Sequence, residues 1–158
     1  MFKKILGSIW QKMPRGLRLR IIRATQKKFT ASAAAIIVNE RQEILLLEHA
    51  IRAGDGWGIP GGFLESGEQA EDAVRRELLE EIALELENVR LFRVRIINRH
   101  IEFLFLAETH GVAEIKSGEI KSIGWFGADE LPEQMSLAQK SIIRKVLSGE
   151  FDKKVFGN

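Results

Sequence analysis

The chain has 158 residues and a mass of 17.9 kDa, which is the size of a single domain. Hydrophobic residues make up 45% and charged residues 29%, so the composition excludes a wholly disordered or fibrous protein. Cysteine is absent, which excludes disulfides and thiolate metal sites and leaves oxygen and imidazole as the possible metal ligands. The longest uncharged apolar-rich run, 31–38, is far shorter than the roughly 20 residues of a membrane-spanning helix.

The net charge of +2 conceals an uneven distribution along the chain. Nine Lys and Arg residues and no acidic residue precede Glu40, whereas the remainder carries 15 basic and 22 acidic residues, a net of −7. Apolar residues recur at three- and four-residue spacing over 2–13, which is typical of an amphipathic helix, and Pro14-Arg15-Gly16 interrupts the pattern before a second helical stretch over 17–24. We therefore predict a basic amphipathic segment over 1–28, a folded domain over 29–150 and a tail over 151–158.

Three interpretations of the basic segment remain open. Its apolar stripe could pack on the domain, its cations could contact anionic lipid or nucleic acid, or it could be an organellar targeting peptide, because such peptides are rich in Arg and poor in acid. We expect a cytoplasmic protein without stable membrane insertion, with organellar targeting as the alternative.

The elements after residue 29 alternate between short strands and helices. Strands are predicted over 30–38 and 43–47 with a hairpin turn at 39–42, and a glycine-rich loop follows over 52–62. The strongest helix prediction covers 66–84, where Ser66 and Gln69 have the spacing of a capping box. Strands over 89–97, 101–109 and 120–126 and a closing helix over 136–148 complete an α+β pattern, which favours a sandwich with a mixed sheet.

The long predicted helix carries carboxylates in unusual places. At about 100° per residue, Glu81 falls inside the apolar stripe formed by Ala70, Val74 and Leu78, and Glu77 falls on its edge. Burial of a carboxylate costs several kcal/mol unless it is neutralised, paired or bound to metal. The i, i+3, i+4 spacing of Glu77, Glu80 and Glu81 provides the oxygen ligands that Mg²⁺ or Mn²⁺ prefers, although pairing with Arg75 or Arg76 is the ordinary explanation for glutamates on a helix.

Residues 62–84 resemble the signature of a known family. Gly62 is followed after five residues by Glu68, and after seven more by Arg76-Glu77-Leu78-Leu79-Glu80-Glu81-Ile82-Ala83-Leu84, which closely resembles the Nudix box. Ala83 stands where the family usually has glycine. The resemblance extends from about residue 29 to 147 and omits the basic segment. It implies an α/β/α sandwich and a hydrolase that cleaves a nucleoside diphosphate linked to another moiety, such as a nucleotide, a nucleotide sugar or ADP-ribose.

The resemblance also implies roles for individual residues. Glu77, Glu80 and Glu81 would be catalytic Mg²⁺ or Mn²⁺ ligands, with the Gly61 carbonyl as a further ligand. Arg76 would orient the carboxylates, and Gly62 and Glu68 would support the loop and the helix. A glutamate outside the box often acts as base or ligand in this family, and our candidate is Glu119, followed by Glu114 and Glu102.

The substrate is not named by the sequence, because the marker residues of the better-known Nudix subgroups are absent. We predict substrate contacts from Arg52, Trp57, Phe63 and Arg99, with His100, Phe103 and Phe105 as further candidates. Alternatives to a small-nucleotide hydrolase are an RNA 5′-end pyrophosphohydrolase, with the basic segment contacting RNA, and a catalytically weak nucleotide- or RNA-binding module. A homodimer is possible by resemblance.

Overall fold

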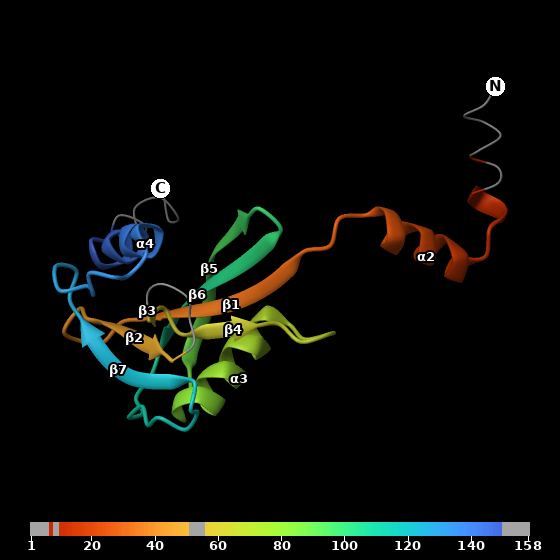
Figure 1. The fold of residues 1–158 in the computed structure, drawn as a ribbon. Helices are drawn as coiled ribbons and strands as arrows, with labels where there is room; N and C mark the ends of the chain where they lie inside the picture. Colours follow the sequence, from red (N-terminus) through yellow and green to blue (C-terminus); the bar gives the residue numbers. More distant parts are fainter. Residues whose placement is uncertain (1–6, 8–9, 51–55, 150–158) are drawn as a thin grey trace.

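The computed structural model describes residues 7, 10–50 and 56–149, which form two β-sheets and three helices (Figure 1). The larger sheet has the strand order β4-β1-β6-β5 and the smaller one β3-β2-β7. The strands are β1 (Thr30–Ile37), β2 (Ile44–His49), β3 (Trp57–Gly58), β4 (Gly61–Phe63), β5 (Glu87–Ile97), β6 (His100–Glu108) and β7 (Ile120–Phe126). The helices are α2 (Arg15–Thr25), α3 (Ala70–Ile82) and α4 (Leu137–Leu147).

The larger sheet is mixed, as the sequence predicts. Strand β1 pairs parallel with β6 and antiparallel with the short β4, and β5 and β6 form an antiparallel hairpin. The predicted turn over 39–42 is also present, because the Asn39 side chain accepts hydrogen bonds from the backbone N–H groups of Arg41 and Glu43, both at 2.9 Å.

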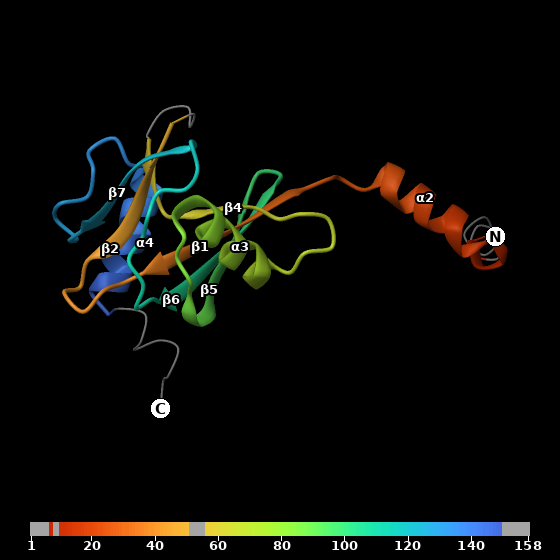
Figure 2. The same cartoon turned by 90° about the horizontal axis from the view of Figure 1, so that it is seen from below.

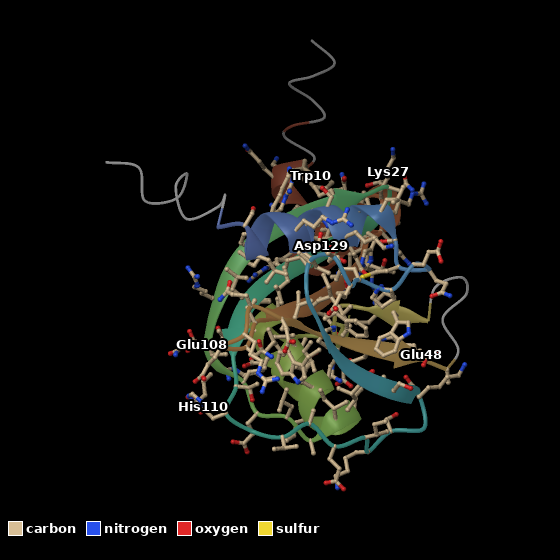
Figure 3. The ribbon with its side chains drawn as sticks, turned by 90° about the vertical axis from the view of Figure 1, so that its left-hand side faces the viewer. Trp10, Lys27, Glu48, Glu108, His110 and Asp129 are labelled. Atoms are coloured by element: carbon tan, nitrogen blue, oxygen red, sulfur yellow. The ribbon has the colours of Figure 1, made fainter. Side chains whose placement is uncertain are left out.

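Strand β1 is buried on both faces because each face meets a different core. Ala33, Ala35 and Ile37 pack with α3, whereas Ala34 and Ile36 pack with α4, in keeping with the two-residue alternation of a strand. This double burial explains the nearly continuous apolar run over 31–38. Figure 3 shows the sheets between α3 on one side and α4 on the other, so the predicted α/β/α sandwich of the α+β class is confirmed.

Helix α3 begins at Ala70, four residues later than predicted, and the predicted capping box is wrong. Gln69 occupies the N-cap position, and no side chain caps the helix there. The carboxylate of Glu68 instead accepts a hydrogen bond from the Glu65 backbone N–H at 2.8 Å, while Gly67 has a φ of 89°. A left-handed residue within 66–69 breaks the helical geometry, so these residues form a turn.

Helix α3 ends at Ile82, and its C-cap residue Ala83 takes the left-handed conformation with φ 52° and ψ 33°. Its N–H is bonded to the carbonyls of Leu78 and Leu79, as in a glycine C-cap. The alanine at the usual glycine position therefore keeps the same helix exit, in a conformation that L-residues rarely adopt.

Helix α2 projects away from the rest of the chain in both views (Figures 1 and 2). It has no buried residue, so the structure does not support, for α2, the interpretation in which the basic segment packs on the domain. Most of the predicted helix over 2–13 lies outside the described residues, and within its described part residues 10–12 are helical. The predicted tail over 151–158 lies entirely outside the described residues. Among the residues that the structure describes, no helix is long and apolar enough to cross a membrane.

Candidate active site

A cavity of about 490 Å³ opens where α3, β4 and the segment just before β7 meet β1. The sequence-predicted residues that line it are Gly61, Gly62, Phe63, Glu77, Glu81, His100, Glu102 and Glu119. They come from four separate stretches of the chain, so the fold is what brings them together.

The carboxylates of α3 differ sharply in exposure. Glu81 is only 7% exposed and lies in the buried stripe with Val74, Leu78 and Ile82, as the helical spacing predicts. Glu77 is half-buried on the edge of that stripe, and both residues line the cavity. The Glu80 side chain is 62% exposed, points to Arg76 and does not line the cavity.

Two glycines of β4 allow the loop to lie tightly against its neighbours. Gly61 has a φ of 148°, and a Cβ there would collide with the backbone of Ala33 and Ala34 on β1. A Cβ on Gly62 would collide with the carboxylate of Glu77. Gly61 thus lets β4 pair with β1, and Gly62 leaves room for a catalytic candidate.

Arg76 holds the loop and the helix together through hydrogen bonds in several directions. Its Nε and a terminal nitrogen donate to Glu68 at 2.8 and 3.1 Å, and it also donates to the Phe63 carbonyl at 3.2 Å. The other terminal nitrogen donates to Glu77 at 2.9 Å and to Glu80 at 3.4 Å. The hydrogen bond with Arg76, and then that from the Glu65 N–H, lower the pKa of Glu68, while the Glu68 carboxylate raises the pKa of Arg76.

The segment that carries Glu119 is bound to the end of α3. The Glu81 carbonyl accepts hydrogen bonds from the N–H groups of Lys116 and Ser117, at 2.8 and 3.2 Å. On the other side, the Glu119 carbonyl accepts from the Ala50 N–H at 2.7 Å. These backbone bonds place Glu119 in the same cavity as Glu77 and Glu81.

The other two glutamates proposed from the sequence are placed differently. Glu114 is exposed, forms an ion pair with Lys116 at 2.8 Å and does not line the cavity. Glu102 lines it but is half-buried in an ion pair with Arg95. Of the three candidates, Glu119 therefore combines access to the cavity with proximity to the end of α3.

Two histidines line the cavity, of which the sequence indicated His100 as a further candidate for substrate contact and gave His49 no role. The His100 ring is held by Thr30 and Ser32, whose hydroxyl oxygens lie 2.8 Å from Nδ1 and Nε2 respectively. Phe63, 65% exposed, meets the same ring edge to face with centroids 5.7 Å apart. His49 enters from β2. The pairing of Thr30 with His100 across parallel strands decides the His100 position, and no local sequence signal carries that information.

Several predicted substrate contacts are not at the cavity. Trp57 packs edge to face on Phe126 with centroids 4.9 Å apart, and Arg99 is exposed at the β5–β6 turn, so neither lines it. Phe105 is buried in the core and Phe103 packs against that core. Arg52 lies outside the described residues.

The donor chemistry of the cavity fits a hard divalent cation. Three carboxylates, those of Glu77, Glu81 and Glu119, line it together with Gly61, and oxygen is the ligand atom that Mg²⁺ and Mn²⁺ prefer. Within the described residues, no three acidic or imidazole groups are gathered closely enough to hold a metal, and Arg76 is paired with Glu77 and Glu80. Metal ligation therefore competes with Arg76 for these carboxylates.

Comparison with known proteins agrees with this arrangement. The family model described as the NUDIX domain matches residues 28–146, which is most of the chain. The chain belongs to the Nudix family. A solved MutT Nudix hydrolase from Burkholderia pseudomallei superposes with a TM-score of 0.68 at 28% identity, covering 76% of this chain and 99% of that one.

Two curated relatives have more specific descriptions. An NAD-capped RNA hydrolase of Pectobacterium carotovorum is 32% identical over 107 residues, which is 65% of this Nudix chain and 41% of the relative. An 8-oxo-dGDP phosphatase of Mus musculus is 36% identical over 104 residues, 62% of this chain and 32% of the relative. The matched region thus spans less than half the length of either relative.

Proposed function

We propose that this Nudix protein is a pyrophosphohydrolase that cleaves a nucleoside diphosphate linked to another moiety and depends on Mg²⁺ or Mn²⁺. The observation that carries the proposal is the 7% exposure of Glu81 beside Glu77 and Glu119 at one cavity. Burial of a carboxylate beside other carboxylates destabilises a fold unless the group is neutralised, hydrogen-bonded, paired or bound to metal. A protein that only packed this helix would gain stability from an apolar residue at position 81.

We propose that the carboxylates of Glu77, Glu80 and Glu81 and the carbonyl of Gly61 would hold the metal, with Glu80 leaving its contact with Arg76. A bound Mg²⁺ or Mn²⁺ would neutralise the diphosphate and lower the pKa of the attacking water. Water attacks a phosphorus atom, its proton passes to a carboxylate for which Glu119 is our candidate, and the bridging P–O bond breaks. Arg76 is a positioning residue, because it holds Glu68 and Glu77 through hydrogen bonds rather than lining the cavity.

The aromatic residues that line the cavity support a role in nucleoside binding. Phe63 is exposed there and offers an aromatic face for stacking, and the hydroxyls of Thr30 and Ser32 fix the orientation of His100. We propose Phe63 and His100 as the substrate contacts in place of Trp57 and Arg99, which lie elsewhere.

Replacement of Glu81 by Gln tests the proposed activity. The amide keeps the shape but loses the negative charge, so kcat should fall by several orders of magnitude, as expected when an essential metal ligand is lost. Melting of the chain with and without Mn²⁺ should show a smaller metal-induced stabilisation in Glu81→Gln. The matched control is Glu85→Gln, an exposed glutamate just beyond α3 that does not line the cavity. An unchanged rate in Glu81→Gln would refute the mechanism.

The substrate class is tested with a panel of ADP-ribose, NADH, diadenosine polyphosphates, nucleoside triphosphates, nucleotide sugars and 5′-capped RNA, each with Mg²⁺ or Mn²⁺. The expected result is turnover of at least one diphosphate-linked nucleotide. Binding without turnover of any of them would favour the alternative of a nucleotide- or RNA-binding module.

A second candidate function, hydrolysis at RNA 5′ ends, is favoured by the similarity to an NAD-capped RNA hydrolase. The distinguishing experiment compares NAD with NAD-capped RNA as substrates. A kcat/KM that is higher for the capped RNA would support this function, and a preference for the free dinucleotide would assign the enzyme to small nucleotides.

A further inference from the structure

The catalytic proposal leaves the basic segment without a role, although the segment has an unusual surface. Helix α2 and the residues after it carry six cations and no acidic residue: Arg15, Arg18, Arg20, Arg23, Lys27 and Lys28. Four aliphatic side chains on the same helix are 36–47% exposed: Leu17, Leu19, Ile21 and Ile22. A helix that exposes both cations and aliphatic groups to water is expected to have a partner that accepts both.

The charges of α2 are arranged around one uncharged stripe. At about 100° per residue, an arc of roughly 160° between Arg20 and Arg18 contains Leu17, Ile21 and no charged residue. The two flanking arginines can extend their heads away from the stripe while their stems cover it. This is the arrangement of a helix that lies in the plane of a lipid interface.

A shallow hollow follows along the same segment. Four cations line it with Ile22 and Ala24: Arg20, Arg23, Lys27 and Lys28. Four cations along one hollow suit a phosphate group, which can belong to a phospholipid head or to a nucleic acid.

The tip of the β5–β6 hairpin extends this surface onto the domain. The Thr30 N–H, at the start of β1, donates to the Arg99 carbonyl at 3.0 Å, so the tip lies where α2 joins the domain. Ile96 is 70% exposed, Ile97 46% and Phe29 47%. The basic end, defined as residues 15–29 and 96–100, thus combines cations and exposed apolar groups without one carboxylate side chain.

We propose that the basic end docks on an anionic phospholipid surface. The aliphatic stripe of α2 and the hairpin tip enter the interface, and the cations contact the head groups. Each Lys or Arg near such a surface contributes about 1 kcal/mol. This inference is independent of the catalytic proposal, because none of its residues except His100 lines the active-site cavity.

Two other partners fit the surface less well. Single-stranded RNA would use the cations, but its binding sites combine cations with aromatic side chains on which bases stack, and the described part of the segment provides only Trp10 and Phe29 for that purpose. A second copy joined by a twofold axis would bring the same cations of both chains face to face. Only the lipid surface accommodates the exposed aliphatic groups and the charge together.

Co-sedimentation of the full chain with vesicles tests the proposal. The chain should sediment with equimolar phosphatidylcholine and phosphatidylglycerol, sediment far less with phosphatidylcholine alone, and be released by salt. The double variant R20Q/R23Q should bind the anionic vesicles about 30-fold more weakly, from the loss of two surface cations. The matched control K121Q/K145Q removes the same charge from exposed positions of β7 and α4 and should bind as the unmodified chain does.

A second pair of variants separates lipid from the other partners. L17S/I21S keeps every cation, so it should lose vesicle binding while its affinity for a single-stranded RNA oligomer is unchanged, and I96S/I97S should also weaken vesicle binding. Equal binding of both vesicle types, or no effect of L17S/I21S on vesicles, would overturn the proposal. Tight RNA binding without vesicle binding would assign the surface to RNA, and a dimer dissociated by L17S/I21S would assign it to a second copy.

Discussion

The two helices that cover the sheets, α3 and α4, follow different rules. Helix α4 has Ser136 as a side-chain N-cap, accepting from the Gln139 N–H at 3.3 Å, and its buried residues are the aliphatic Ile142 and Ile143. Helix α3 has no side-chain cap, buries Glu81 and ends on a left-handed alanine. Local rules of stability are broken on α3, which carries the catalytic candidates, and obeyed on α4, which lines the cavity through Gln139 alone, as is expected when function opposes stability.

The largest effect on stability should come from α4. Ile143 is fully buried in the core on the far side of the sheets from Glu81, so Ile143→Ala should lower the free energy of unfolding by about 2–5 kcal/mol. Chemical denaturation measures this loss. The activity of the folded fraction should stay unchanged, and a parallel loss of kcat would show that the two helices do not have the separate roles proposed here.

Gly62→Ala should have an effect of similar size, but on the reaction rate and not on the free energy of unfolding. The new Cβ would displace the flexible carboxylate of Glu77, and misplacing a reacting group by about 1 Å can lower the rate roughly 100-fold. Gly61→Ala is the informative comparison, because its Cβ would meet the backbone of β1 and should destabilise the fold instead. Steady-state kinetics and thermal melting of both variants test whether Gly62 affects the rate and Gly61 the stability. Equal changes of rate and of melting temperature in the two variants would contradict this prediction.

A smaller change of opposite sign is expected at the end of α3. Ala83→Gly removes the steric cost of a left-handed alanine and should raise the free energy of unfolding by about 0.5–1 kcal/mol, the cost being offset partly by the greater backbone freedom of glycine. Denaturant titration measures the gain. A lower stability for Ala83→Gly would show that packing of the alanine methyl outweighs its strain.

The smallest effect is a pH dependence at the start of α3. The pKa of Glu68 is lower in the folded chain than its ordinary value of 4.5. Its carboxylate therefore stabilises the fold fully at pH values above 4.5, and this contribution is lost as the pH falls through the pKa of the folded chain. The free energy of unfolding should therefore differ between the wild type and Glu68→Gln by a constant amount at neutral pH. The difference should shrink below about pH 4.5, and a constant difference throughout would exclude the ionised pair with Arg76 as its source.

The sequence by itself determined the features that depend on local periodicity. The position of Glu81 in a buried stripe follows from 3.6 residues per turn, and the double burial of β1 follows from an unbroken apolar run. The Nudix box and the α/β/α class also followed, because the motif occupies one continuous stretch. The capping box failed because Arg76, eight residues away, binds Glu68 and holds 66–69 in a turn.

Only the tertiary structure decided which distant residues share the cavity. Glu119 comes close because backbone bonds tie residues 116–117 to the end of α3, and His100 because β6 pairs with β1. Trp57 and Phe63 look alike as stacking candidates in the sequence, yet the first packs on Phe126 and the second is exposed at the cavity. The sequence also did not predict that α2 projects away from the domain. An apolar stripe indicates that a surface will be covered, but it does not indicate which partner covers it.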